Sequence, residues 1–426
     1  AQVGSKVLVF APHRVATLVM PTIAGLPRLI EGLDDVAREE VERLYRVEEL
    51  EGEIEVPATF RAKVARWCGG TDASSEAWKK VQCQRIVSIH NRWTYESCTF
   101  NALRSSRPVV GGAGGKATPD EVARACEGPG LCEFCEVERL TAVEPFGRVR
   151  GRHCMTAGNA FKSAGLHGLL IWTRHAPHQL TAEEVSDAFQ TADSWFERAL
   201  AWDQKKGRGR AKHEVMFWNC FHSAGASQIH PHMQMQLFEG PVAYEGLLRD
   251  QSARYRQQHQ DDDLCQLMVR VHGHLGLALS DEDRKLAFGD TVAGCWATLT
   301  PRVGGGELSA LGVASPAGRP CLAGLALATS AMHRALRAYG AEGISTGGFQ
   351  VASADGGLAW MIRCSNRGSA VASSVDAGST EIMGLTGACS DPYALITALK
   401  AELKPASCDA AQPRDGSLRA LLLSND

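Results

Sequence analysis

The sequence has no large excess of charge of either sign. Its 426 residues include 45 lysines and arginines and 48 aspartates and glutamates, which leaves a net charge of −3 at pH 7. Such a balance gives no general attraction to nucleic acid or to an anionic membrane surface. We therefore expect no nucleic-acid partner, and any affinity for phosphate has to be local.

A long apolar run is also missing. A helix that spans a bilayer needs about 20 consecutive apolar residues, and the stretch 7–30 is interrupted by His13, Arg14 and prolines. The chain as a whole is 44% apolar and 22% charged, which is typical of globular proteins. We therefore expect a soluble protein without a membrane span, long enough for two domains.

Closely spaced cysteines are rare, although cysteine itself is not. Among the 14 cysteines, only Cys132 and Cys135 form a C-x-x-C pair. Disulfide scaffolds are usually short chains. The pattern favours free thiols in a reducing compartment, either the cytoplasm or the matrix of an organelle, together with one possible metal-binding pair.

A phosphate-binding P-loop is absent as well. The glycine-rich stretch 109–116 does not end in Lys-Ser/Thr, so it is interpreted as a flexible loop. A short helix is expected directly after it, with Thr118 as its N-cap and Pro119 at its first position. Upstream, the spacing of apolar residues over 33–50 predicts an amphipathic surface helix.

The remaining patterns predict an α+β fold. Short apolar runs at 169–172 and 215–218 are expected to be strands, with a helix starting at Thr181 between them. A similar order of strands and a helix follows later in the chain. Strands are expected near 272–278, 348–352 and 359–363, and a helix near 322–338. We predict antiparallel sheets covered by helices, in two tandem domains of similar build. The expected boundaries are a partly helical extension at 1–83, a catalytic domain at 84–245 and a degenerate second domain at 246–426.

The strongest chemical signal lies between Asn219 and Gln234. Residues 228–238 alternate polar and apolar side chains, which predicts a half-buried strand with His230, His232 and Gln234 on one face. A neutral imidazole can attack phosphorus, and a neighbouring amide can stabilise the charge that develops on oxygen. Just upstream, Gly225 lets the backbone approach a phosphate and Ser227 can donate to its oxygens.

The segment N-x-x-x-x-x-G-x-S-x-x-H-P-H-x-Q resembles the active-site strand of galactose-1-phosphate uridylyltransferases, which belong to the histidine-triad-like (HIT-like) superfamily. The resemblance implies that His232 is the nucleophile that forms a nucleotidyl-histidine intermediate. It also implies that Gln234 binds and orients the transferred phosphoryl group, and that Asn219, Gly225 and Ser227 shape a phosphate cradle. A HIT-like fold follows from the same resemblance.

A zinc site is the second implication of the resemblance. The first histidine of H-P-H, His230, is a zinc ligand in that family, and its partners there are an upstream C-x-x-C and an intervening histidine. This chain supplies Cys132, Cys135 and either His175 or His178, of which we favour His175. Two thiolates and two imidazoles make a closed tetrahedral zinc site.

Further candidates are less specific. Arg104 and Arg107, in an R-x-x-R-P segment similar to that of the transferases, are candidate phosphate ligands because guanidinium groups match phosphate oxygens in pairs. Their other interpretation is a pair of surface arginines before a proline. Lys162 or His167 could line a sugar or base pocket. In the expected second domain Arg363 stands where the family has histidine, so we expect no metal there and at most a fixed cation for phosphate.

These observations predict an enzyme that moves a nucleoside monophosphate. The resemblance implies a nucleotidyltransferase or a nucleotide-sugar phosphorylase, with a nucleotide sugar or dinucleotide and a phosphate acceptor as its partners. The alternative is a catalytically altered accessory or structural subunit of a larger assembly, since a fold does not determine a function. A homodimer is compatible with either.

Overall fold

The structure is a computed structural model of the 426-residue chain. It describes residues 21–67, 76–103, 117–127, 132–260, 262–315, 319–353, 357–371, 384–388 and 390–404. The predicted phosphate ligands Arg104 and Arg107 and the glycine-rich loop lie outside these residues. Within them no helix is both long enough and apolar enough to cross a membrane.

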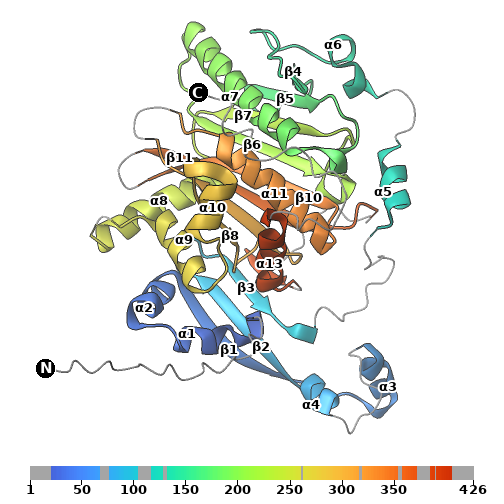
Figure 1. The fold of residues 1–426 in the computed structure, drawn as a ribbon, viewed down its shortest axis with the longest axis vertical. Helices are drawn as coiled ribbons and strands as arrows, with labels where there is room; N and C mark the ends of the chain where they lie inside the picture. The colour runs from blue at the N-terminus through green and yellow to red at the C-terminus, as the bar shows by residue number, and fades with distance from the viewer. Residues whose placement is uncertain are drawn as a thin grey trace, which may run out of the picture.

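Helices and strands are interspersed along the chain (Figure 1). The helices are α1 (Leu26–Glu31), α2 (Asp35–Leu44), α3 (Ala58–Trp67), α4 (Glu76–Gln82), α5 (Pro119–Cys126), α6 (Val137–Leu140), α7 (Ala182–Lys205), α8 (Ala243–Gln258), α9 (Leu264–His274), α10 (Asp281–Phe288), α11 (Ala323–Tyr339) and α13 (Pro392–Leu403). The strands are β1 (Tyr45–Glu53), β2 (Cys83–Asn91), β3 (Ser97–Phe100), β4 (Cys154–Gly158), β5 (Leu166–Trp172), β6 (His213–Cys220), β7 (His232–Phe238), β8 (Val292–Ala297), β9 (Glu307–Gly312), β10 (Gly343–Ala352), β11 (Leu358–Gly368) and β12 (Leu385–Ala388).

The main sheet contains a repeated unit. Over the described residues its eight strands run in the order β4-β5-β7-β6-β10-β11-β9-β8, all paired antiparallel. Read from either edge, the order is first, second, fourth and third strand of a unit, with α7 or α11 between the second and third. The α+β prediction and the expectation of two tandem units of similar build are therefore confirmed. The two units share one continuous sheet, because β6 pairs with β10 from Val215↔Phe349 to Cys220↔Ile344.

A smaller sheet joins distant parts of the chain. Its described strands have the order β1-β2-β3-β12, with β12 parallel to β3. Figure 1 shows β1, β2 and β3 below the main sheet, and β12 brings the C-terminal part of the chain to the same place. This sheet therefore draws strands from all three of the segments that we delimited in the sequence.

The long helices cover one face of the main sheet. α7 and α11 pack against each other, and the ring of Trp218 in β6 stacks on His333 of α11 with centroids 4.3 Å apart. Gly168 in β5 allows this close packing, because a Cβ there would lie 2.6 Å from the indole of Trp195 in α7. α8 contacts the opposite face, where Tyr244 meets Phe349 of β10 edge-on at 5.4 Å. The polar site residues lie on this opposite face.

Local signals predicted several elements well. Thr118 and Thr181 both form capping boxes, at the starts of α5 and α7, as their positions before Glu-containing first turns indicated. The expected strands at 169–172 and 215–218 lie within β5 and β6, and the helix near 322–338 is α11.

Two predicted elements are wrong. The helix expected over 33–50 ends at Leu44, because residues from Tyr45 onwards pair with β2 over the full length of β1. The strand expected near 272–278 is instead the end of α9, which continues to His274 and packs on α2 and β8. In both cases long-range contacts decided the conformation of a segment whose local pattern was ambiguous.

Candidate active site and metal centre

The predicted strand 228–238 begins later than its alternation indicated. β7 starts at His232, and residues 228–231 form no strand. A tight loop precedes it. In this loop Phe221 is buried with φ 66° and ψ 165°, a region that non-glycine residues rarely occupy, and Gly225 has φ 89°. His230 therefore lies in the loop before β7 and His232 on the strand, and the ring nitrogens of the two imidazoles have different partners.

Four side chains gather at the start of this segment. Cys132, Cys135, His175 and His230 each offer one ligand atom, and these atoms all lie within 4.8 Å of one another. Nδ1 of His230 lies 3.5 Å from each of the two sulfur atoms. Nδ1 of His175 lies 3.3 Å from Sγ of Cys135 and 3.1 Å from Nδ1 of His230. This cluster could hold a metal ion.

Backbone carbonyls set the tautomers of both histidines in the cluster. Nε2–H of His230 donates to the carbonyl of Trp172 at 2.7 Å, and Nε2–H of His175 donates to the carbonyl of Cys126 at 2.9 Å. A neutral imidazole that donates from Nε2 keeps its lone pair on Nδ1. Both lone pairs are therefore directed into the cluster, which is how metal-ligating histidines are usually oriented.

His178 lies outside the cluster. Its Nδ1 is 3.7 Å from Sγ of Cys126, and its ring stacks on Phe221 with centroids 6.4 Å apart. The structure therefore brings His175 and not His178 to the two thiols, the choice that the sequence had left open.

Burial changes the proton affinity of the cluster. Burial lowers the pKa of His230 to about 4, although the hydrogen bond to Trp172 opposes the shift. Burial and the neighbouring Cys132 raise the pKa of Cys135 to about 11. A metal ion bound here has to displace the thiol protons, whereas His230 is already neutral.

His232 is buried on the face of β7 opposite the long helices. Its Nδ1–H donates to the carbonyl of His230 at 3.0 Å, so the lone pair is on Nε2. Phe134 meets the ring edge-on at 5.1 Å. Burial lowers the pKa of His232, against the opposing effect of the hydrogen bond to His230. The side chain is therefore a neutral imidazole with a fixed tautomer.

Gln234 follows on the same face and is held by a histidine. Its Oε1 lies 2.9 Å from Nε2 of His167, a residue of β5. Lys162, which we considered for a sugar pocket together with His167, instead pairs with Glu144 at 2.6 Å and binds the carbonyl of His167 at 3.0 Å. Neither residue lines the cavity described below.

The predicted phosphate cradle is partly assembled. Gly225 and Ser227 are exposed on the loop before β7. A Cβ added at Gly225 would lie 3.7 Å from Nδ2 of Asn219, so Asn219 lies directly beside this loop. Asn219 also pairs with Ser345 across the junction of the two units.

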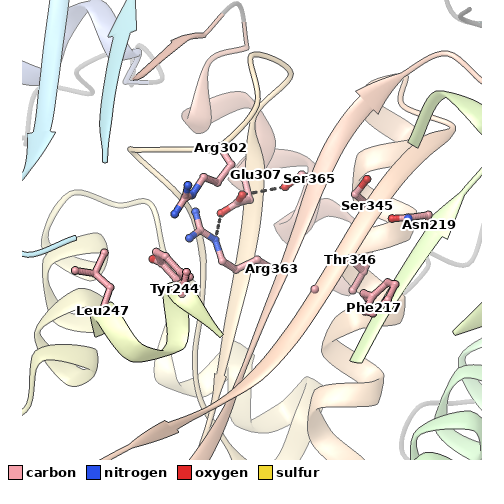
Figure 2. A pocket seen from close by; sticks show the side chains of 12 residues that line it. Phe217, Asn219, Tyr244, Leu247, Arg302, Glu307, Ser345, Thr346, Arg363 and Ser365 are labelled. Atoms are coloured by element: carbon pink, nitrogen blue, oxygen red, sulfur yellow. Dashed lines mark hydrogen bonds and ion pairs between the residues drawn. The ribbon is translucent and has the colours of Figure 1, made fainter. Parts of the chain in front are cut away.

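A cavity of about 570 Å³ lies on this face, beside the junction of β6 and β10 (Figure 2). It is lined by Phe217, Asn219, Ala243, Tyr244, Leu247, Arg302, Glu307, Ser345, Thr346, Gly347, Arg363 and Ser365. Neighbouring residues on adjacent strands connect this cavity to Gln234. Gln234 pairs with Phe217, Phe217 with Gly347, and Gly347 with Arg363. Within the repeated unit Arg363 of β11 thus occupies a place equivalent to that of Gln234 of β7.

Arg363 is neutralised by acidic neighbours. Its Nε lies 2.6 Å from Glu307 and its Nη1 lies 3.0 Å from Glu96, and Figure 2 shows the Glu307 carboxylate between Arg363 and Ser365. Glu96 also pairs with Arg302 at 2.6 Å. No histidine lines this cavity. Neither Glu96 nor Glu307 is predictable as a partner of Arg363 from the sequence, because nothing in their local sequence points to a residue so far along the chain.

Similarity to known proteins is found among solved structures. No family model and no curated protein matches the chain. Among solved structures, an ADP-glucose phosphorylase from Arabidopsis thaliana with bound ADP-glucose matches at 14% identity and a TM-score of 0.48, over 74% of this chain and 98% of that one. A GalT-like protein from the same plant matches at 15% identity and a TM-score of 0.45, over 63% and 91%.

A yeast Ap4A phosphorylase in complex with Ap4A matches at 14% identity and a TM-score of 0.30, over 81% of this chain and 97% of the other. Identities this low describe the fold alone and give no information about the reaction. Among these solved structures the chain is similar to an ADP-glucose phosphorylase, a GalT-like protein and a uridylyltransferase.

Proposed function

We propose that the protein is a nucleotidyltransferase or nucleotide-sugar phosphorylase that works through a nucleotidyl intermediate on His232. The observation that carries the proposal is the fixed tautomer of this residue. Because Nδ1–H is held by the carbonyl of His230 at 3.0 Å, the lone pair is on Nε2. Among the described residues no hydrogen bond to Nε2 is found, so that lone pair is free to attack phosphorus.

The reaction divides into two displacements at one phosphorus atom. In the first, Nε2 of His232 bonds to the α-phosphorus of the donor, and the bond to the bridging oxygen breaks. A nucleotide sugar then releases a sugar phosphate, and a dinucleotide releases a nucleotide. In the second, a phosphate oxygen of the acceptor attacks the same phosphorus, and the bond to Nε2 breaks. Each half exchanges one bond for another of similar energy, so positioning and charge stabilisation are the main requirements.

The neighbours of His232 fit the developing charge. The phosphorylated imidazole is cationic, and the carbonyl of His230 that accepts from Nδ1–H lowers the cost of that charge. Gln234 lies two residues along the same strand face, where its amide would donate to a phosphoryl oxygen without competing as a nucleophile. Asn219, Gly225 and Ser227 are the proposed cradle for the phosphates, together with Arg104 and Arg107.

Zinc is the metal that the four-residue cluster fits best. Two thiols and two imidazole Nδ1 lone pairs converge within 4.8 Å, a donor set that favours zinc over hard cations. With all four positions supplied by Cys132, Cys135, His175 and His230, zinc would hold the loop before His232 in place. The cluster residues would thus support the site structurally and take no part in the displacement.

An accessory role remains the second candidate, and one observation favours it. The residue equivalent to Gln234 in the second unit, Arg363, is paired with Glu96 and Glu307, so its charge is already balanced before a phosphate binds. A HIT-like subunit could have kept its fold and lost turnover. The experiment below separates the two candidates.

Incubation with UDP-, ADP- or GDP-glucose labelled in the α-phosphate tests the proposal. We expect an acid-labile nucleotidyl adduct on the wild-type protein with one of these donors. The His232→Gly variant should form none, a loss of at least 1000-fold on the scale typical of nucleophile removal, while its zinc content and circular dichroism stay those of the wild type.

His153→Gly is the matched control, because its ring lies just before β4 and its one polar partner found among the described residues is Glu183, at 3.4 Å. This variant should form the adduct normally. A wild-type protein that forms no adduct with any donor, or a His232→Gly variant that forms it at the normal rate, would contradict the proposal and favour the accessory role.

A further inference from the structure

A polar network on β5 and β7 surrounds the side chain of Gln234. His167 pairs in register with Gln236, and its ring reaches along the face to Oε1 of Gln234 at 2.9 Å. The other side of the ring faces Ser163, whose backbone N–H donates to Nδ1 at 3.1 Å. His167 is itself buried, with 2% of its surface exposed.

The backbone donor determines the tautomer of His167. A backbone N–H cannot act as an acceptor, so Nδ1 of His167 has to hold the lone pair and Nε2 has to carry the proton. The amide nitrogens of Asn159 and Gln236 also approach Nε2, at 3.0 and 3.4 Å, but a protonated ring nitrogen accepts from neither. Nε2–H therefore donates to Oε1 of Gln234, the one acceptor found near it among the described residues.

The tautomer in turn determines which way the amide of Gln234 points. With Oε1 held by His167, the NH₂ group is directed away from β5. Among the described residues no hydrogen bond to that NH₂ group is found, and the side chain is partly exposed on the face that carries His232. Without the histidine the amide could rotate by 180° and present its oxygen, which would repel a phosphoryl oxygen.

We propose that His167 is a positioning residue that holds the Gln234 amide with its NH₂ group toward the phosphoryl group being transferred. The inference rests on the proposed function, and it assigns to His167 an effect through Gln234 and no contact with substrate. The surroundings keep the ring in place, because Lys162 binds the His167 carbonyl at 3.0 Å and pairs with Glu144. Burial, with Lys162 nearby, lowers the pKa of His167, so the ring stays neutral.

The kinetic test is a double-mutant cycle on adduct formation. His167→Phe should slow transfer to His232 by roughly 10- to 100-fold, the size expected for a misplaced catalytic group. Gln234→Ala should slow it at least as much. If His167 acts through Gln234, the double variant should be no slower than Gln234→Ala alone, because the second change removes nothing further.

A second pair of variants separates positioning from folding. His167→Gln keeps a side-chain N–H that can reach Oε1 of Gln234, so it should recover part of the rate lost in His167→Phe. His153→Phe, an equally drastic change outside the network, should have no effect. A normal rate in His167→Phe, or losses that multiply in the double variant, would overturn the proposal.

A spectroscopic measurement tests the tautomer without relying on activity. In protein labelled with ¹⁵N at histidine, His167, identified by its loss in His167→Gln, should show a protonated Nε2 and an unprotonated Nδ1. The opposite tautomer would overturn the proposal even if the enzyme is active. A wild type that forms no adduct but shows the expected tautomer would contradict the proposed function and the catalytic purpose of His167, while upholding the geometry.

Discussion

At the scale of single residues, the hydrogen-bond acceptor of each histidine N–H determines which ring nitrogen keeps the lone pair. His230 and His175 donate Nε2–H to carbonyls and keep Nδ1 for the cluster, whereas His232 donates Nδ1–H and keeps Nε2. Two histidines that are separated by one proline thus present opposite nitrogens. In the proposed function, this difference suits one ring to metal binding and the other to attack on phosphorus.

The metal assignment gives a prediction at this scale. Protein prepared without chelators should contain one zinc per chain, and Cys135→Ser should reduce this to near zero, because a hydroxyl is a far weaker zinc ligand than a thiolate. His178→Ala should keep the zinc, since its ring stacks on Phe221 outside the cluster. Elemental analysis by mass spectrometry measures both. Zinc lost in His178→Ala but kept in Cys135→Ser would contradict the assignment.

At the scale of elements, a buried group of charges joins the small sheet to β11. Glu96, in the turn between β2 and β3, receives Arg363 at 3.0 Å and Arg302 at 2.6 Å. Both guanidinium groups also lie 4.9 Å from the ring of Tyr244 at the start of α8. Burial alone would raise the pKa of Glu96, yet the two guanidinium groups hold it below its usual value.

Removing the carboxylate should therefore destabilise the fold. Glu96→Gln leaves Arg363 with Glu307 alone and removes the carboxylate that pairs with the partly exposed Arg302. We therefore expect the free energy of unfolding to fall by about 3 kcal/mol, the lower end of the cost of breaking a buried ion pair. Urea unfolding followed by circular dichroism measures the change. Glu49→Gln, which breaks a solvent-exposed pair with Arg85, is the control and should leave the urea midpoint unchanged. Equal midpoints for Glu96→Gln and wild type would show that the cluster does not join the sheets.

A histidine in α9 gives the fold a pH dependence. His272 donates Nδ1–H to the carbonyl of Met268 and lies between Tyr45 and Trp296. Burial lowers its pKa to about 4, below the 6.5 of an unperturbed histidine. Between these two values the unfolded chain binds the proton and the folded protein does not. The free energy of unfolding is therefore highest above pH 6.5 and decreases as the pH falls toward 4.

His272→Asn should reduce this dependence, because the amide can still donate to Met268 but cannot be protonated. We expect the wild type to lose up to about 1.4 kcal/mol more per pH unit than the variant below pH 6.5. Urea midpoints at pH 7.5 and 5.0 for both proteins give the comparison. Parallel losses in the two proteins would show that His272 is not the group responsible.

At the scale of the whole molecule, the two repeated units are joined through their sheets and cannot separate without breaking β6 from β10. β12 ties the end of the chain to β3 in the same way. We propose that the segments 84–245 and 246–426 unfold together, although each has the build of one unit. A stable folded unit of residues 84–245 alone would leave the hydrogen-bonding edge of β6 open.

Hydrogen exchange measures this coupling. In the full-length protein under mild urea, amides of β5 and β7 should exchange with the same free energy as those of β9 and β11, because one opening event exposes all four strands. Gly348→Val should lower both values equally, since a Cβ at Gly348 would lie 2.7 Å from Ile362 and 3.0 Å from Met216 across the junction. Two distinct free energies, with only one sensitive to this substitution, would indicate independent units.

The sequence by itself determined the features that depend on near neighbours. The capping residues Thr118 and Thr181, the C-x-x-C pair and the alternation of β7 are visible locally, because helix starts, metal-ligand pairs and strand faces depend on spacings of a few residues. Local patterns of this kind predicted the α+β fold, and the resemblance of residues 219–234 to the transferases implied His232 as the nucleophile.

Only the tertiary structure decided the rest. It placed His175 and not His178 beside the thiols, turned 45–53 into a strand through pairing with β2, and surrounded Arg363 with two carboxylates. Each of these outcomes depends on contacts between residues far apart in the chain, and the free energy of such contacts outweighs local propensity. The hydrogen bond between His167 and Gln234 belongs to the same class, because it exists only where β5 lies next to β7.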